Sequence, residues 1–550
     1  MTAVASVRRS TPPSTPRIGA PALRAALAAP GEIAVLDVRE EGLFGEGHPF
    51  LAVNAPYSRL EREVPALVPR RSTAVVVLDD GDGLADTAAR RLAAIGYGDV
   101  RVLDGGVPAW VAAGFEVYKS VNSRFKAFAE VVEHAFDTPS IAAAELDHLR
   151  REGADLVVLD SRTPEEFARF HVPGAVSCPG ADLVLNFDRF VASEDALVVV
   201  SCAGRTRGII GAQSLIDAGV PNRVRVLKGG TQGWRLAGLA LEAGAVEAPP
   251  AATAPRARAR AEAVRARHGV PLVDPRTLAG WLTTESDTRT TYLFDLRAAG
   301  ARAAAPLPGA VAAAGGQLVQ ALDRWVGVQH ARLVLADDDG VRARMTAHWL
   351  IQLGEDVHVL DDADLDSARE LPPAGAAAPA RATVELVSPA AAAALLREGA
   401  VALSLDDSAA FRAGHAAGAV WTIRPRLAAL PAALLAAPVL VLFAAALDLA
   451  ALAALDLREL SSARVVAVDG GVAAWRAAGL PVEVTPAVPA DAERIDYLFW
   501  AHDRHDGNAD AMRTYLGWEE QLPAQVAAEG GGGFRLLEPA SGVDAEHATA

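Results

Sequence analysis

The chain is 550 residues long, with 51% hydrophobic and 22% charged residues and a formal net charge of −16. A single core rarely grows past ~250–300 residues, so this length predicts several domains, and the composition excludes a disordered protein. The acidic residues are scattered along the chain, whereas a nucleic-acid-binding protein needs a clustered basic surface. We therefore expect no nucleic-acid partner.

Cysteine content and apolar runs indicate the compartment. Only Cys178 and Cys202 are present, which excludes a disulfide framework and favours a reducing, cytoplasmic setting. The N-terminal residues lack the apolar core of a secretion signal. The uncharged run 427–447 is long enough to span a bilayer, but Pro431 and Pro438 interrupt it. We expect a helix end and a short strand there, and no membrane association.

In chain order, one pattern of elements returns. A helical pattern is followed by an apolar strand ending in Asp-x-Arg, a second helix and strand, a loop, a helix, a strand and Gly-Gly. This alternation is typical of α/β domains, each a mostly parallel sheet flanked by helices. We expect tandem domains over residues 16–120, 138–245, 270–363 and 382–486, followed by a tail over 487–550.

Three short phrases carry the repeat. Gly-Gly-x-x-x-Trp occurs at residues 105–110, 229–234 and 470–475. Asp-x-Arg occurs at residues 37–39, 160–162 and 295–297. His-Val-Pro-Gly-Ala at 171–175 is matched by His-Ala-Ala-Gly-Ala at 415–419. The third domain lacks the tryptophan phrase and is therefore predicted to be degenerate.

Composition marks the connections between these domains. Residues 120–138 form a charged and aromatic connector, and residues 247–267 and 363–381, rich in Ala and Pro, are predicted linkers. In the tail, residues 495–521 are dense in aromatic residues and are predicted to pack as helix. The glycine-rich end from Gly530 is predicted to be disordered.

One stretch of the second domain carries the chemistry. An apolar run ends at Ser201, Cys202 follows, and a helical pattern begins after the small and basic residues up to Gly208. A strand that turns into a helix leaves the first helical N–H groups unpaired, and the helix dipole adds positive charge there. With Arg205 and Arg207 alongside, we expect Cys202 to be partly thiolate and to meet an anionic substrate.

The other domains serve as an internal control. Alignment without gaps places Asp79, Asp337 and Phe443 at the position of Cys202 in the first, third and fourth domains. Further acidic residues follow Asp79 and Asp337, and they would repel an anion. These three domains are therefore predicted to be inactive.

The same comparison sorts the remaining candidates. The pair Asp160 and Arg162 recurs in domains without the cysteine and is predicted to be a structural clamp. His171 is a tempting general base, but its counterpart His415 lies in an inactive domain, and Trp234 is predicted to belong to the core.

Two further residues of the second domain are interpreted separately. Lys228 is replaced by Asp104 and Asp469 elsewhere, so it is a candidate for steering anions. Cys178 is predicted to be a buried thiol.

Together these motifs resemble the rhodanese sulfurtransferases, most strongly over residues 138–245. The whole chain resembles bacterial proteins with four tandem rhodanese domains, of which one is active. The tail 496–505 is similar to tails of that group. Its His-x-x-His spacing suggests a metal, but with no third ligand well placed we expect packing and no metal or other cofactor.

The resemblance implies a sulfurtransferase that works through a persulfide on Cys202. The thiolate would attack the outer sulfur of thiosulfate or a similar donor, and cyanide or a cellular thiol would accept that sulfur. The implied substrate-binding residues are Ala203, Gly204, Arg205, Thr206, Arg207, Gly208 and Lys228. The loop N–H groups would stabilise the persulfide, and Arg205 and Arg207 would hold the donor's oxyanion. Ala203 and Arg205 depart from the commonest family choices.

Two alternatives stand beside this interpretation. Related cysteine phosphatases and arsenate reductases carry arginine six positions after the cysteine, where this chain has Gly208. The shorter loop favours sulfur over phosphate. A non-enzymatic persulfide carrier or scaffold, which hands sulfur to an accepting protein, stays open.

Overall fold

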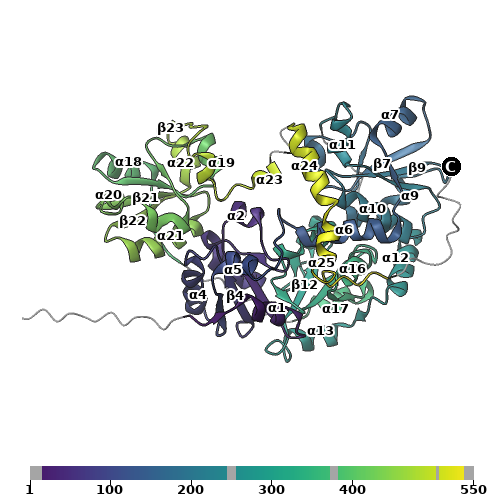
Figure 1. Cartoon of the computed structure of the whole chain (residues 1–550), viewed down its shortest axis with the longest axis horizontal. Helices are drawn as coiled ribbons and strands as arrows, with labels where there is room; N and C mark the ends of the chain where they lie inside the picture. Colours follow the sequence, from purple (N-terminus) through teal and green to yellow (C-terminus); the bar gives the residue numbers. More distant parts are fainter. Residues whose placement is uncertain (1–14, 245–254, 372–381, 503, 505–506, 538–550) are drawn as a thin grey trace, which may run out of the picture.

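The computed structural model describes residues 15–244, 255–371, 382–502, 504 and 507–537 (Figure 1). In these residues, helices flank four mostly parallel sheets, so the predicted α/β fold class is confirmed. We call each sheet with its helices a unit and number the units in chain order. Figure 1 shows the fourth unit at the left, the first below the centre, and the second and third at the right.

The first and second units share one strand order. The first sheet runs β1 (Arg17–Ile18), β5 (Val100–Leu103), β4 (Ala74–Leu78) and β2 (Ile33–Asp37), with β3 (Val53–Asn54) also on β2. Its helices are α1 (Ala20–Ala28), α2 (Glu41–Glu46), α3 (Leu60–Leu67), α4 (Leu84–Ala94) and α5 (Gly106–Ala112). The second sheet runs β6 (Ser140–Ile141), β10 (Val224–Leu227), β9 (Leu197–Ser201), β7 (Leu156–Asp160) and β8 (Val176–Ser177). Its helices are α7 (Ala143–Arg151), α8 (Pro164–Arg169), α9 (Leu183–Phe190), α10 (Thr206–Asp217) and α11 (Gly230–Leu236).

The third and fourth units repeat this arrangement. The third sheet runs β11 (Leu272–Val273), β16 (Asp356–Leu360), β15 (Arg332–Ala336), β12 (Thr291–Asp295) and β13 (Val311–Ala312). Its helices are α13 (Pro275–Leu282), α14 (Ala299–Ala304), α15 (Gly315–Gln320), α16 (Arg342–Gln352) and α17 (Leu365–Ala368). The fourth sheet runs β17 (Glu385–Val387), β22 (Arg464–Val468), β21 (Val439–Phe443), β18 (Val401–Ser404) and β20 (Val420–Trp421). Its helices are α18 (Pro389–Arg397), α19 (Ser408–Ala413), α20 (Ala432–Leu435), α21 (Leu447–Leu460) and α22 (Gly471–Ala477), and β19 (His415–Ala416) pairs with β23 (Val482–Glu483).

The units are not independent of one another. Strand β14 (Val328–Gln329), from the third unit, pairs antiparallel with β2 of the first sheet. Between the first and fourth units, buried Arg424 binds Glu61 at 2.6 Å and Asp456 at 2.9 Å. Trp349 of the third unit donates a hydrogen bond to Ser214 of the second at 2.8 Å. The predicted domain boundaries stay predictions. Strand β14 lies within the predicted third domain but belongs to the sheet of the first unit.

The predicted connectors are more ordered than expected. The 120–138 connector contains α6 (Ser123–Phe136), a 14-residue helix whose apolar side is buried. The predicted linker 247–267 is wrong over its second half, which forms α12 (Pro255–Arg267), because Ala257, Ala261 and Val264 are buried. Residues 247–254 and 372–381 of the two predicted linkers lie outside the described residues.

The tail forms α23 (Phe499–His502), α24 (Ala509–Glu519) and α25 (Leu522–Ala528). It contacts every unit: Ser408 of the fourth, Leu43 of the first, Gln352 of the third and, through α24, the second. The expected disorder from Gly530 is wrong for residues 530–537, where Phe534 packs on Phe128 at 5.2 Å. Residues 538–550 and His505 of the His-x-x-His phrase lie outside the described residues, and His502 stacks on Tyr497.

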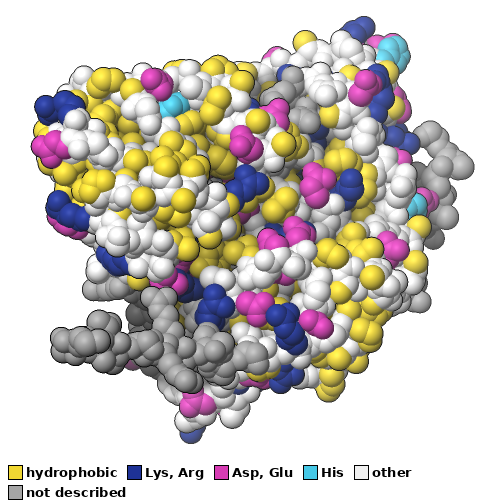
Figure 2. Space-filling view, turned by 60° about the vertical axis from the view of Figure 1, so that its left-hand side comes forward, with side chains coloured by type: hydrophobic (Ala, Val, Ile, Leu, Met, Phe, Trp, Pro, Cys, Tyr) yellow, Lys and Arg dark blue, Asp and Glu magenta, His cyan; other side chains and the backbone are white. Residues whose placement is uncertain are grey.

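Within the described residues, no helix is long and apolar enough to cross a membrane. The uncharged run 427–447 holds α20 and β21, as a helix end and a short strand. Figure 2 turns the fourth unit toward the viewer and shows hydrophobic side chains spread among charged ones on that face. Exposed members of that unit include Leu386, Val420, Leu447 and Leu460.

Candidate active site

Cys202 follows β9 directly, at the carboxyl end of the second sheet, and α10 begins at Thr206. Ligands of open parallel sheets bind at this edge. Gly230, with φ +52°, packs against the loop so closely that a Cβ would lie 2.3 Å from the Cys202 carbonyl oxygen. The Gly-Gly phrase therefore lets α11 approach the loop, and the Thr231 N–H donates to that carbonyl at 2.8 Å.

The cysteine itself is enclosed. Cys202 is only 2% exposed to solvent. Burial raises the pKa of the Cys202 thiol to about 11, against the charge of Arg207 and the N–H groups of Gly208 and Gly204, which lower it. The expectation of a partly ionised thiol at a loop rim is therefore wrong for this resting state, because desolvation outweighs the cradle.

The first unit shows what the same cradle does with an anion. The carboxylate of Asp79 accepts hydrogen bonds from the N–H groups of Gly81 at 2.9 Å, Gly83 at 3.0 Å and Ala85 at 2.9 Å. Gly81 and Ala85 lie two and six positions after Asp79, as Gly204 and Gly208 lie after Cys202. The loop geometry thus binds a negative group at the position of the cysteine.

The third unit fills its loop in a similar way. Asp337 accepts hydrogen bonds from Ala343 at 2.8 Å and Gly340 at 3.2 Å. Burial, together with the nearby Asp339, raises the pKa of Asp337 to about 8. Both acidic loops therefore carry a built-in occupant.

In the fourth unit the predicted counterpart of Cys202 is wrong by one residue. Strand pairing sets Asp160 opposite Ser201 and Ser404 opposite Phe443, so the residue after Phe443 matches Cys202. A Cβ on Gly471 would lie 2.5 Å from the carbonyl oxygen of Ala444, which repeats the contact of Gly230 with Cys202. Ala444 holds the position, because the stretch from the loop to the tryptophan is one residue shorter here.

Arg207 is oriented by a carboxylate. Its two terminal nitrogens donate to Glu166 at 2.6 and 2.8 Å. Burial alone would raise the pKa of Glu166, but the hydrogen bonds and charge of Arg207 lower it to about 2. Glu166 also closes a capping box with Thr163 at the start of α8. Arg207 is thus fixed beside the cysteine, whose pKa it lowers.

Arg205 has a different set of contacts from those expected. Its guanidinium binds Glu130 at 2.8 Å, Glu133 at close range, and Glu520 at 3.0 Å. Glu130 and Glu133 belong to α6, and Glu520 directly follows α24. The expectation that Arg205 holds the donor's oxyanion is therefore revised: in this arrangement it ties the loop to two neighbouring helices.

The other predicted loop residues line or brace the cradle. The Ala203 carbonyl accepts hydrogen bonds from the Gln232 N–H at 3.1 Å and the Thr231 hydroxyl at 3.3 Å. A Cβ on Gly208 would lie 2.9 Å from Val226 and 3.5 Å from the Cys202 sulfur. Thr206 starts α10, and Lys228 is exposed, with no ion pair among the described residues.

The residues interpreted as structural bind one another or the neighbouring backbone. Arg162 grips Asp160 through two 2.8 Å hydrogen bonds and donates to the Phe170 carbonyl at 2.6 Å. His171 stacks on Phe167 and engages its carbonyl at 2.9 Å. The first and fourth units repeat this stacking with His48 on Phe44 and His415 on Phe411.

Trp234 donates to the Ala240 carbonyl at 2.8 Å in the core. Cys178 is fully buried, and burial raises the pKa of its thiol well above the ordinary range.

Sequence comparison missed several residues at this site. Glu166 and Gln232 align with Leu43 and Pro108 in the first unit, so the internal control could have found them. Glu519, in the tail, lies against Gly204, and its aromatic neighbours Tyr515 and Trp518 were the available signal. Lys126 of α6 is buried against those two rings, and no pattern in the sequence indicated its place at the site.

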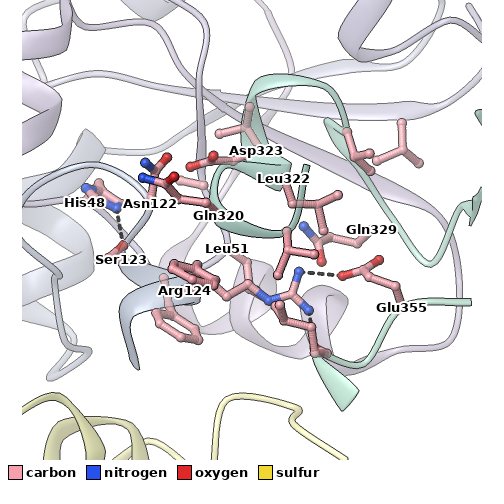
Figure 3. A pocket seen from close by; sticks show the side chains of 18 residues that line it. His48, Leu51, Asn122, Ser123, Arg124, Gln320, Leu322, Asp323, Gln329 and Glu355 are labelled. Carbon is pink, nitrogen blue, oxygen red and sulfur yellow. Dashed lines mark hydrogen bonds and ion pairs between the residues drawn. The ribbon is translucent and has the colours of Figure 1, made fainter. Parts of the chain in front are cut away.

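A small pocket lies elsewhere, between the first unit, α6 and the third unit (Figure 3). Arg124 binds Glu355 across it at 2.6 Å, and His48 meets Ser123 at 2.9 Å. None of its lining residues belongs to the Cys202 loop.

Comparison with known proteins adds to this geometry. A sequence model of the Rhodanese-like domain matches residues 20–113 and 142–237. The crystal structure of thiosulfate sulfurtransferase from Pseudomonas aeruginosa is 41% identical, with a TM-score of 0.87 over 95% of this chain and 100% of that chain. A curated thiosulfate sulfurtransferase of the same organism is 29% identical over 188 residues, 30% of this chain and 65% of the relative. An HTH-type transcriptional regulator of Mycobacterium tuberculosis is 32% identical over 106 residues, 19% of this chain and 46% of the relative. The chain thus spans less than two thirds of the length of both curated relatives.

The mostly parallel sheets, with a cysteine loop between a strand and a helix, place the chain among α/β proteins. The 41% identity to a solved thiosulfate sulfurtransferase, over the whole length of that relative, narrows this class to one family. The chain belongs to the rhodanese family.

Proposed function

We propose that the protein is a sulfurtransferase that moves the outer sulfur of thiosulfate, or a similar anionic donor, to cyanide or a thiol through a persulfide on Cys202. The observation that carries the proposal is the anion cradle. The N–H positions that hold the Asp79 carboxylate also face the Cys202 sulfur. A negatively charged thiolate or persulfide is stabilised by such donors.

The reaction divides into two steps. In the first, the Cys202 thiolate attacks the outer sulfur of the donor; a new S–S bond forms, and sulfite leaves with the electron pair of the broken bond. In the second, the acceptor attacks the terminal sulfur and the thiolate leaves. Arg207, fixed by Glu166, lowers the energy of the negative charge on Cys202 in both steps.

The four tandem domains, three of them inactive, belong to the same proposal. The aspartates in the first and third loops and Ala444 in the fourth leave Cys202 as the nucleophile. A cytoplasmic location suits two free cysteines. A carrier that hands sulfur to a partner protein would need its persulfide exposed, whereas Cys202 is 2% exposed.

The test measures thiocyanate formed from thiosulfate and cyanide by the full chain. We expect double-displacement kinetics, and we expect Cys202→Ser to abolish turnover while Cys178→Ser retains it. Mass spectrometry after thiosulfate treatment should show one added sulfur on the Cys202 peptide. Turnover by Cys202→Ser would refute the proposal, and a persulfide that forms but is not discharged by small acceptors would favour the carrier.

A further inference from the structure

The helix between the first and second units packs on the helix that follows the cysteine loop. Helix α6 lies along α10 (Figure 1). Just after α6, the Thr138 hydroxyl donates a hydrogen bond to Gln213 of α10 at 2.9 Å. Because α6 ends at Phe136, before the predicted second domain begins, its contacts with the loop come from outside the domain that supplies the cysteine.

Glu130 of α6 binds Arg205 of the loop through two parallel hydrogen bonds. Arg205 Nε donates to Glu130 Oε1 and Nη2 donates to Oε2, both at 2.8 Å. Glu130 is 0% exposed, and a two-pronged pair of this kind fixes the orientation of both groups. Nη2 also binds Glu133, and Nη1 binds Glu520 at 3.0 Å. All three guanidinium nitrogens of Arg205 thus donate to carboxylates.

The backbone of Arg205 lies in the middle of the anion cradle. The N–H groups of Gly204 and Gly208, which flank it in sequence, bond to the Cys202 sulfur. The Arg205 carbonyl accepts the Cys202 thiol at 3.6 Å and the Ile209 N–H at 3.1 Å. Since the two glycines have no Cβ, they restrain the loop backbone little. The anchored side chain of Arg205 therefore restrains the backbone that contacts the sulfur.

The internal repeats show what replaces Arg205 in the other units. The position three residues after the match to Cys202 is held by Asp82, Gly340 and Leu447. Asp82 is exposed and accepts a hydrogen bond from the Leu84 N–H at 3.1 Å, within its own loop. Gly340 has no side chain, and Leu447 is uncharged and 53% exposed. The arginine anchor thus accompanies the cysteine and is not a general feature of the fold.

We propose that Glu130 is a positioning residue for sulfur transfer, an inference that rests on the proposed function. Through Arg205 it holds the loop in the geometry that aims the sulfur and its N–H donors. In both steps the same sulfur carries negative charge, first as attacking group and then as leaving group, so both steps need that geometry. Helix α6 is thereby part of the catalytic apparatus, although it lies outside the domain of the cysteine.

The test compares kcat and KM for thiosulfate in the full chain at saturating cyanide. Glu130→Gln keeps the size of the side chain but removes its charge, and we expect kcat to fall about 10- to 100-fold because reacting groups are misplaced. KM should change by less than about twofold, since Arg205 does not bind the donor in this arrangement. A raised KM with kcat retained would instead mean that Arg205 holds the donor's oxyanion, and the positioning role would be wrong.

Glu61→Gln is the matched control. Glu61 is 2% exposed and binds Arg424 between the first and fourth units at 2.6 and 2.8 Å. Each variant takes a buried carboxylate from an arginine, so thermal unfolding should occur at a lower temperature in both. We expect a normal kcat in Glu61→Gln. An equal loss of kcat in the two variants would show an effect of stability alone and would overturn the proposal.

A double variant tests whether Glu130 acts through Arg205. Arg205→Met combined with Glu130→Gln should be no slower than Arg205→Met alone, because the second change removes nothing further. Losses that multiply would contradict this route. If Glu130→Gln does not fold, Arg205→Lys replaces it, since lysine keeps the charge but not the fork. A normal kcat in Arg205→Lys would then refute the positioning role.

Hydrogen exchange separates this proposal from the proposed function, because it needs no turnover. The amides of Gly204 and Gly208 should exchange faster in Glu130→Gln than in the unaltered protein, and at the normal rate in Glu61→Gln. Unchanged exchange in Glu130→Gln would overturn the role of Glu130 whatever the turnover. Absence of thiocyanate from the unaltered protein would instead refute sulfur transfer itself.

Discussion

The loops after β4 and β9 share one backbone arrangement but hold different side chains. In the first unit, the carboxylate of Asp79 accepts three backbone N–H groups; in the second, the sulfur of Cys202 faces two groups at matching positions. The acidic side chain in the first loop does not merely repel an anion, as the sequence suggested. It is the anion, supplied by the chain itself, so the cradle is a property of the fold and its occupant decides the chemistry.

The largest effect is expected when a cysteine is placed in the first loop and removed from the second. We expect Asp79→Cys in a Cys202→Ser background to form thiocyanate no faster than Cys202→Ser alone. The first loop lacks counterparts of Arg207, Glu166 and Gln232, and its α4 begins with Leu84 and Ala85. Turnover restored by the double variant would mean that the cradle and a thiol are sufficient.

The second test removes the fixed cation. Arg207→Ala should lower kcat/KM for thiosulfate about 100-fold, since loss of one donor to a developing negative charge costs ~10²–10³ in rate. Arg225→Ala removes an arginine from β10 whose partner Glu145 is exposed, and it should leave the rate unchanged. A normal rate in Arg207→Ala would remove this residue from the site.

The third test empties the acidic loop. Asp79→Ala leaves three N–H groups of the first loop without their acceptor, and we expect a loss of about 1–3 kcal/mol in stability of that unit. Hydrogen exchange at Gly81, Gly83 and Ala85 should accelerate, while sulfur transfer at Cys202 continues. Unchanged exchange at these amides would show that the carboxylate does not hold the loop.

The smallest effect concerns Glu166, whose folded-state pKa of about 2 lies below its ordinary value of 4.5. A depressed pKa stabilises the fold above pH 4.5, and this contribution is lost as the pH falls toward 2. Because Glu166 is partly exposed, we expect Glu166→Gln to cost no more than about 1 kcal/mol at pH 7. Thermal unfolding should show the difference shrinking between pH 4.5 and 2; a constant difference would contradict an ionic origin.

Local patterns in the sequence predicted the repeated sheets and the cysteine loop, because each depends on nearby residues. The apolar run before Ser201, the glycines at 229–230 and the Asp-x-Arg phrase act within one unit. Gap-free counting failed in the fourth unit, where one deleted residue moved the match from Phe443 to Ala444.

The remainder of the site depends on contacts that sequence order hides. The pKa of the Cys202 thiol depends on its burial, and α24, which lies far along the chain, packs against the neighbouring Gly204. Arg205 finds its carboxylates on α6 and on the residue after α24. The sequence shows that an arginine is present but not which carboxylate it binds. The substrate-binding role assigned to Arg205 could therefore not be tested before the structure.

The tail that crosses all four units also fixes an order of events during synthesis. The strands and helices of the second unit have all been made by residue 240, before any of the tail. The covering helix is translated only after residue 508. A nascent chain therefore carries the Cys202 loop without the helix that packs on Gly204 and Gly229 for the time needed to make nearly half of the protein.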